Sequence, residues 1–182
     1  MKQKKLIILL VVATAFFTSL LNSGCGVYSF ADVSVPDSVK TVRVNFIENK
    51  ARYINPQLSP QLTERLRQKI VNQTRLTQTQ SEDVHWDINA SIMDYSITTS
   101  AISSNQSGGT GSQRQAPVTN RLTVSIQLTV LNRLNNTTQE HSVSRSFEFD
   151  ANLALQTAEN QLLDEMIRSL TDDLFNRMFS NW

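Results

Sequence analysis

The chain has 182 residues, and its 17 Lys and Arg nearly balance its 16 Asp and Glu. Its single cysteine, Cys25, excludes an intramolecular disulfide and any metal site built from several cysteines. The length is sufficient for one domain with a hydrophobic core of its own.

The N-terminal residues have the pattern of a bacterial export signal. Three lysines within the first five residues precede an uncharged, mostly apolar run over 6–21, and Asn-Ser-Gly-Cys follows. The run is shorter than the ~20 residues that a membrane span needs, and small residues precede Cys25. We therefore expect residues 1–24 to be a lipoprotein signal peptide and Cys25 to be acylated, although Asn22 stands where such signals usually have Leu. A plain signal peptide and an uncleaved anchor are the alternatives.

Cleavage before Cys25 would leave 158 of the 182 residues. Residues 25–38 are then predicted to be a lipidated tether, and residues 39–182 a single domain. Gly26 follows the cysteine where an Asp would favour retention in the inner membrane. This position therefore favours the outer membrane.

Alternating side chains predict the first strand over 39–47, with Val42, Val44 and Phe46 on its core face.

The first helix is predicted to begin at Pro60, with Ser59 as its N-cap. Leu62, Leu66 and Ile70 recur at helical spacing, so this helix has one buried stripe.

The second long strand is predicted over 84–97, and its alternation changes parity partway along. Apolar residues of one parity are Trp86, Ile88, Ala90 and Ile92, and those of the other are Met93, Tyr95 and Ile97. One extra residue near 92–94, a β-bulge, would return both sets to the same face.

Residues 100–117 are almost entirely Ser, Gly, Gln, Asn and Thr, and we expect a flexible loop there. Neither the lysine of a phosphate-binding loop nor a helix follows its glycines. The segment is therefore interpreted as a hairpin tip.

Two further strands are predicted over 118–131 and 139–149. In the first, alternate residues are apolar: Val118, Leu122, Val124, Ile126, Leu128 and Val130. In the second, Val143, Phe147 and Phe149 are expected to face inward. The opposite face of the first strand is polar, so it is either in water or docks a partner.

A wide apolar stripe predicts a long C-terminal helix. Its members are Ala158, Leu162, Leu163, Met166, Ile167, Leu170, Leu174 and Met178. Asp164 with Arg168, and Asp173 with Arg177, are expected to form i, i+4 pairs on the exposed side. Leu170 lies in the middle of the stripe and is expected to be fully buried.

The predicted order of elements is β-α-β-β-β-α. This order indicates an α+β fold, a two-layer sandwich in which a four-stranded, mostly antiparallel sheet carries both helices on one face.

Charge is divided unevenly along the chain. Residues 40–75 contain eight basic and two acidic side chains, whereas residues 76–182 contain six basic and twelve acidic ones. Either the two segments neutralise each other, or the first supplies a basic surface for an anionic partner. Candidates for such a surface are Lys40, Arg43, Arg65, Arg67 and Lys69. Arg43 is expected to project from the sheet face opposite the helices.

No pattern typical of an active site is present in the sequence. The two histidines, His85 and His141, have no second ligand at a zinc-motif spacing, and no serine lies in a Gly-x-Ser-x-Gly turn. The adjacent carboxylates Asp172 and Asp173 are expected to be solvated. The basic segment lacks the interleaved aromatic residues that stack on bases, so nucleic acid is not an expected partner. We expect neither catalysis nor a cofactor or metal.

Five stretches of the chain together carry a family resemblance. They are Gly-Val-Tyr-Ser-Phe after Cys25, Val-Lys-Thr-Val-Arg-Val-Asn-Phe from Val39, Leu-Ser-Pro-Gln-Leu-Thr-Glu-Arg-Leu from Leu58, Asp-Ile-Asn-Ala-Ser-Ile-Met-Asp-Tyr from Asp87, and Asn-Arg-Leu-Thr-Val-Ser-Ile from Asn120. With the C-terminal amphipathic helix, they make the chain resemble LptE, a family of lipopolysaccharide-assembly lipoproteins.

The resemblance implies a lipid-anchored protein on the periplasmic side of the outer membrane. Proteins of that family plug the LptD β-barrel, bind lipopolysaccharide, and help to place it in the outer leaflet. The implied partners are an LptD-type barrel, lipopolysaccharide, and membrane lipid through an acylated Cys25. The alternative is a stand-alone envelope lipoprotein that binds a partner, of the peptidoglycan-synthesis activator or secretin-pilot type.

Overall fold

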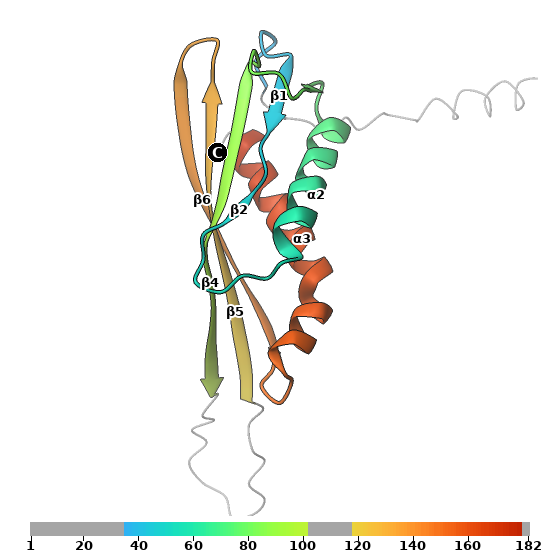
Figure 1. Cartoon of the computed structure of the whole chain (residues 1–182), viewed down its shortest axis with the longest axis vertical. Helices are drawn as coiled ribbons and strands as arrows, with labels where there is room; N and C mark the ends of the chain where they lie inside the picture. The colour runs from blue at the N-terminus through green and yellow to red at the C-terminus, as the bar shows by residue number, and fades with distance from the viewer. Residues whose placement is uncertain (1–34, 102–117, 180–182) are drawn as a thin grey trace, which may run out of the picture. The chain divides into compact units, whose positions relative to one another are not determined.

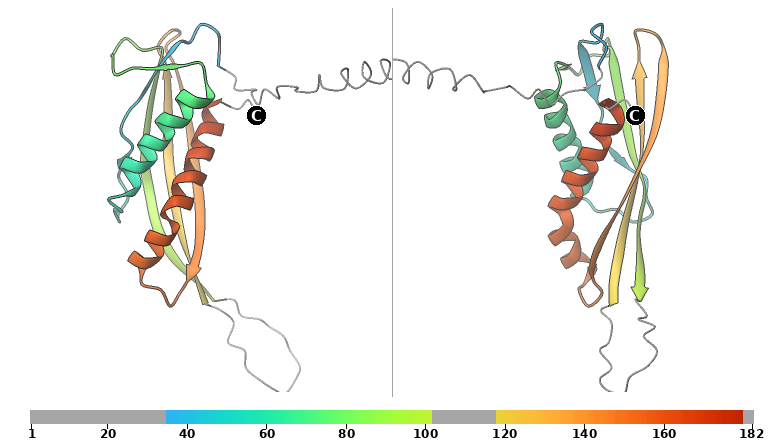
Figure 2. Two further views of the ribbon diagram at one scale, coloured as in Figure 1. Left: turned by 90° about the vertical axis from the view of Figure 1, so that its right-hand side faces the viewer. Right: turned by 180° about the vertical axis from the view of Figure 1, so that it is seen from behind.

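The computed structural model describes residues 35–101 and 118–179, which form a sheet layer and a helix layer. Helices α2 (Leu58–Gln73) and α3 (Leu155–Phe179) lie together on one face of the sheet (Figure 1, Figure 2). No helix of these residues is long and apolar enough to cross a membrane. The predicted signal peptide, Cys25 and most of the predicted 100–117 loop lie outside the described residues.

The sheet is mixed and has six strands, in the order β3-β1-β4-β5-β6, with β2 paired to β4 off this path. The strands are β1 (Thr41–Val44), β2 (Glu48–Asn49), β3 (Thr77–Gln78), β4 (Trp86–Ala101), β5 (Val118–Asn132) and β6 (Thr137–Asp150). β1 runs parallel to β3 and β4, and β2 runs parallel to β4, whereas β4, β5 and β6 are antiparallel neighbours.

The α+β class is confirmed, but the expectation of four mostly antiparallel strands is corrected to six strands in a mixed sheet. The strands β2 and β3 have two residues each, too few to leave an alternating pattern in the sequence. The parallel pairs arise because the chain crosses over through α2 between β1 and β4.

The core lies between the two layers and follows the predicted alternation in the long strands. Side chains buried on β5 are Leu122, Val124, Ile126, Leu128 and Val130, and those on β6 are Val143, Phe147 and Phe149. Leu170 on α3 is 0 % exposed, as predicted. Trp86 stacks on Phe179 with ring centroids 5.8 Å apart, which fixes the last turn of α3 against β4.

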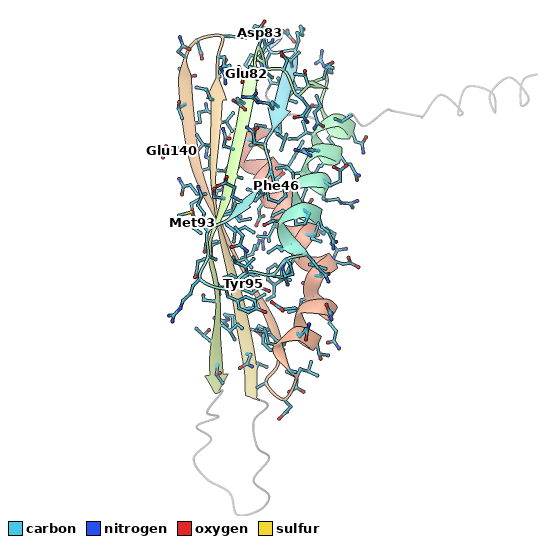
Figure 3. All side chains as sticks on the ribbon, in the orientation of Figure 1. Phe46, Glu82, Asp83, Met93, Tyr95 and Glu140 are labelled. Carbon is cyan, nitrogen blue, oxygen red and sulfur yellow. The ribbon has the colours of Figure 1, made fainter. Side chains whose placement is uncertain are left out.

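The predicted bulge in β4 is confirmed, because the register with β5 shifts between Ile92 and Asp94. Met93 is the extra residue and is 53 % exposed, while Tyr95 returns to the core (Figure 3). The bulge therefore keeps both halves of β4 apolar on the same face.

Phe46 was expected in the core but is 54 % exposed (Figure 3). Val44 pairs with Ile88, a separation of 44 positions, whereas Glu48 pairs with Ser91, a separation of 43. The chain therefore gains one residue between β1 and β2, which reverses the alternation and places Ile47 in the core in place of Phe46.

The start of α2 also differs from the prediction. The helix begins at Leu58 with Gln57 as its N-cap, and no side chain caps it, so the prediction of Ser59 as the cap was wrong. Pro60 still lies in the first turn, where backbone N–H groups have no partner within the helix. The Asn55 side chain instead accepts the backbone N–H of Gln57 at 2.9 Å, which orders the turn before the helix.

Two adjacent carboxylates of α3 bind other elements rather than their own helix. Asp172 forms an ion pair with Lys69 of α2, and Asp173 forms one with Arg145 of β6. Neither predicted i, i+4 pair forms an ion pair in this part of the chain. Asp172 and Asp173 therefore make tertiary contacts that their adjacency did not predict, and the Asp172 side chain remains 50 % exposed.

Candidate functional site

The sheet face opposite the helices, here named the open face, carries mostly uncharged polar side chains. Residues that alternate with the core residues of β4, β5 and β6 point to this face. Three aligned rows cross the strands: Ser91, Gln127 and Ser142; Asp94, Ser125 and Ser144; Ser96, Thr123 and Ser146. In the second and third rows, the hydroxyl groups on β5 and β6 are hydrogen-bonded to each other at 2.9 Å. The centre of the open face is therefore a surface for hydrogen bonding.

Two arginines surround the carboxylate of Asp87 at one end of the open face. Arg43 on β1 donates from Nε to Oδ1 at 3.0 Å and from Nη2 to Oδ2 at 2.6 Å. Arg133, which directly follows β5, donates to Oδ2 at 2.8 Å, and Asn45 donates to Oδ1 at 2.8 Å. These four residues are the Asp87 cluster, and its two guanidinium groups outnumber its one carboxylate.

The hydrogen bonds of the Asp87 cluster keep its carboxylate ionised. Hydrogen bonding from Arg43 is the main cause that lowers the pKa of Asp87 from 3.8 to about 2, against the effect of burial, which raises it. The same contact raises the pKa of Arg43. The side chain of Arg133 stays 41 % exposed, so its guanidinium is accessible to an anion from the solvent.

The three predicted cations of α2 lie in the helix layer, away from the open face. Arg67 donates Nε and Nη2 to the backbone carbonyl of Val44, at 3.2 and 2.8 Å. Lys69 is paired with Asp172 at 2.5 Å. Arg65 lines a groove of about 790 Å³ between α2 and α3.

The structure therefore does not bring the five predicted cations together. Arg43 projects from the open face as expected, whereas Lys40 is exposed just before β1 and donates its backbone N–H to Nδ1 of His85. Sequence reasoning missed Arg133, because it lies in the acidic part of the chain. The one sequence feature that could have indicated Arg133 is its position directly after the strand predicted over 118–131. The register of β4 and β5 brings this position to Asp87.

A second polar cluster surrounds a buried carboxylate. The carboxylate of Glu159 on α3 is 5 % exposed and accepts the hydroxyl groups of Tyr95 at 2.6 Å and Tyr53 at 3.1 Å. The tyrosine rings stack with centroids 5.3 Å apart. Burial is the main cause that raises the pKa of both tyrosines. The cluster therefore holds the segment after β2 against β4 and α3.

Within residues 35–101 and 118–179, no three His, Cys, Asp or Glu side chains gather as metal ligands. The accessible groups of the open face are mainly hydroxyls and amides, with the carboxylate of Asp94 in the centre and the guanidinium of Arg133 at one end, and these groups can hydrogen-bond to a polar partner.

Comparison with known proteins identifies the family of this chain. The model of the family "LptE: Lipopolysaccharide-assembly" matches residues 39–178. No curated protein matches the chain. Solved structures that match this chain include the PelC dodecamer from Paraburkholderia phytofirmans, with 8 % identity, a TM-score of 0.46, and 79 % of this chain and 90 % of that chain covered.

Two others are a hypothetical protein from Chlamydia trachomatis and a minor lipoprotein from Acinetobacter baumannii. The first has 7 % identity and a TM-score of 0.46, covering 79 % of this chain and 100 % of that chain. The second has 11 % identity and a TM-score of 0.37, covering 77 % of this chain and 95 % of that chain. The family match carries the conclusion, because it extends over most of the sequence: this chain belongs to the LptE family of lipopolysaccharide-assembly proteins.

Proposed function

We propose that this chain is an outer-membrane lipoprotein, anchored through Cys25, that plugs and assembles an LptD-type β-barrel and assists the insertion of lipopolysaccharide into the outer leaflet. The family match over residues 39–178 is the observation that carries this proposal. The protein acts by binding and not by catalysis.

The open face supports the barrel as the partner. In an outer-membrane barrel, apolar residues that face the lipid alternate with polar residues that face the lumen, so the interior is polar. A plug in such an interior needs a surface of hydrogen-bonding groups with little net charge. The rows of Ser, Thr and Gln on β4, β5 and β6 meet this requirement.

The Asp87 cluster supports an anionic ligand. Lipopolysaccharide carries phosphate groups, and guanidinium groups bind phosphate through paired N–H donors. Asp87 holds Arg43 in place, and Arg133 is the exposed member of the cluster. In this proposal Arg133 makes the glycolipid contact on the open face, while Lys40 before β1 and Arg65, Arg67 and Lys69 on α2 are further candidates.

Recovery of the barrel in a complex tests the proposal. The full-length chain, with an affinity tag, is co-expressed with the LptD-type protein of the same genome, and the barrel recovered from detergent-extracted outer membrane is quantified. Wild-type chain is expected to recover the barrel in about equal molar amount. Absence of the barrel from this complex would refute plugging and favour the stand-alone lipoprotein.

A pair of variants then assigns the surface. Thr123→Lys with Ser125→Lys adds two charges to the centre of the open face and is expected to reduce recovery. Gln68→Lys with Asn72→Lys adds the same charge to exposed positions of α2 and is expected to leave recovery unchanged. The reverse result would place the barrel on the helix layer.

A further inference from the structure

β6 forms one edge of the sheet and is long for an exposed edge. Its fourteen residues, Thr137–Asp150, pair with β5 in unbroken register, and the described residues provide no strand on its other side. Backbone N–H and C=O groups along that side are available to another chain.

The residues that present these groups follow from the hydrogen bonds of β4. The carbonyls of Ile88 and Ile92 accept N–H groups from Asn45 and Lys50, so even-numbered residues in this half of β4 face β1 and β2. Successive residues of a strand direct their backbone groups to opposite sides. Odd-numbered residues of β5 therefore hydrogen-bond to β4, and even-numbered residues of β5 hydrogen-bond to β6. In β6, the backbone groups of Val143, Arg145 and Phe147 then face β5, and those of Ser142, Ser144 and Ser146 face outward.

This part of the edge lacks the features that block strand addition. β6 contains no proline, no lysine and no bulge. Between Glu140 and Glu148, Arg145 is the one Lys, Arg, Asp or Glu residue, and its guanidinium donates to the carboxylate of Asp173. The window 141–147 is therefore open to a partner strand.

A groove accompanies this window on the helix side. It has a volume of about 610 Å³, and its floor and walls come from Ser142–Arg145 of β6 and from Asp173, Asn176 and Arg177 of α3. Arg145 neutralises Asp173, and no ion pair to Arg177 is found within the described residues. The groove therefore has one uncompensated positive charge beside an open strand edge.

We propose that β6 is a site of β-strand addition, at which an extended segment of the barrel partner pairs with Ser142, Ser144 and Ser146 and places an acidic side chain in the groove beside Arg177. Main-chain bonds to an edge strand supply affinity in this mode, and alternate side chains in an adjacent pocket supply specificity. The inference rests on the proposed function, because the barrel is the partner that supplies the strand.

A second copy of the chain fits this edge less well than a different protein. Antiparallel pairing of two β6 strands centred on the open window, at Ser144, sets Glu140 of each copy opposite Glu148 of the other. Like charges directly opposite each other destabilise a strand pair. An acidic segment of another protein meets Arg177 and avoids this repulsion.

Proline substitution tests the backbone contact directly. Ser144→Pro removes an N–H that β5 does not use, and proline is tolerated on edge strands in this orientation. Ser144→Ala is the matched control, because it removes the hydroxyl and keeps the N–H. Both variants lose the hydroxyl, so their difference reports the N–H alone: in the co-expression assay, Ser144→Pro is expected to recover about tenfold less barrel than Ser144→Ala at limiting concentration.

Charge reversal tests the groove. Arg177→Glu is expected to reduce recovery, whereas Arg168→Glu, an exposed arginine of α3 outside this groove, is expected to leave recovery unchanged.

Hydrogen exchange of the wild-type complex decides the outcome even if the proline variant fails to fold. Amides of Ser142, Ser144 and Ser146 are expected to gain protection in the complex. Unchanged exchange in a complex that still contains the barrel would overturn the inference and leave the proposed function intact. Absence of the barrel with wild-type chain would end both. Concentration-dependent protection in the chain alone would identify a second copy as the occupant and overturn the assignment to the barrel.

Discussion

Arg43 and Asp87 lie opposite each other on the parallel strands β1 and β4, and their side chains share two hydrogen bonds, at 3.0 and 2.6 Å. The pair joins two strands that are 44 positions apart in sequence. It also buries most of the Arg43 side chain, which the sequence had indicated as the best candidate for binding an anionic ligand.

This pair predicts a pH-dependent stability. The pKa of Asp87 is lowered in the folded state from 3.8 to about 2, so its contribution is fully present above the unfolded pKa and is lost as pH falls from about 4 to about 2. The shift corresponds to about 2 kcal/mol. Urea unfolding of wild type and Asp87→Asn is expected to show a difference in free energy that is constant from pH 5 to 7 and shrinks below pH 4. A difference that is independent of pH would contradict the assignment.

Leu170→Ala is expected to destabilise the protein by about 2–5 kcal/mol, because it leaves a cavity between α3 and the sheet. Leu170 is fully buried, whereas Leu162 on the same helix is half-buried. Leu162→Ala is therefore the control and is expected to cost less. Chemical denaturation measures both, and equal losses would show that burial at Leu170 does not determine the effect.

Tyr95→Phe is expected to cost about 1–3 kcal/mol, because it leaves the buried Glu159 carboxylate with one donor fewer. Tyr53→Phe removes the longer hydrogen bond of a more exposed side chain and is expected to cost less. Amide exchange in residues 50–57 is expected to accelerate in both variants. Unchanged exchange there would mean that the phenol groups do not hold this segment.

Arg133→Gln is expected to weaken lipopolysaccharide binding at low ionic strength, with a smaller effect as salt rises. Arg121→Gln is the matched control, since Arg121 also lies on the open face but has the carboxylate of Glu148 to itself, whereas Arg133 shares the Asp87 carboxylate with Arg43. Binding of purified chain to lipopolysaccharide across a salt series measures both variants. Equal losses for the two would show that the Asp87 cluster is not the glycolipid site.

Cys25→Ser is expected to abolish incorporation of a palmitate analogue and to release the mature domain into the periplasmic fraction unless the barrel retains it. Metabolic labelling measures the first effect directly. Equal labelling of the variant and wild type would exclude acylation at Cys25.

The long elements could be predicted because each repeats one simple pattern. From Leu122 to Val130, β5 alternates without interruption, and the change of parity at Met93 predicted the bulge at its correct place. Phe46 could not be placed, because the extra residue between β1 and β2 is visible only through its pairing with β4. Local alternation determines which face a side chain occupies, but register with a distant strand determines where that alternation changes.

The candidate site was harder to predict for the same reason. The many basic residues in 40–75 suggested a common surface, but Arg43 lies on the open face of the sheet, whereas Arg65, Arg67 and Lys69 lie in the helix layer. Arg133 joins Arg43 through strand registers rather than through sequence proximity. Which cation is accessible depends on which carboxylate is nearby, and that follows only from tertiary structure.

The two neighbouring carboxylates of α3 have a mechanical consequence. Consecutive residues of an α-helix point about 100° apart, and Asp172 reaches Lys69 on α2 while Asp173 reaches Arg145 on β6. Rotation of α3 about its own axis in either direction would stretch one of these ion pairs. The two ion pairs therefore restrain rotation of α3 about its own axis in both directions. High salt should weaken this restraint, while hydrophobic contacts keep α3 on the sheet.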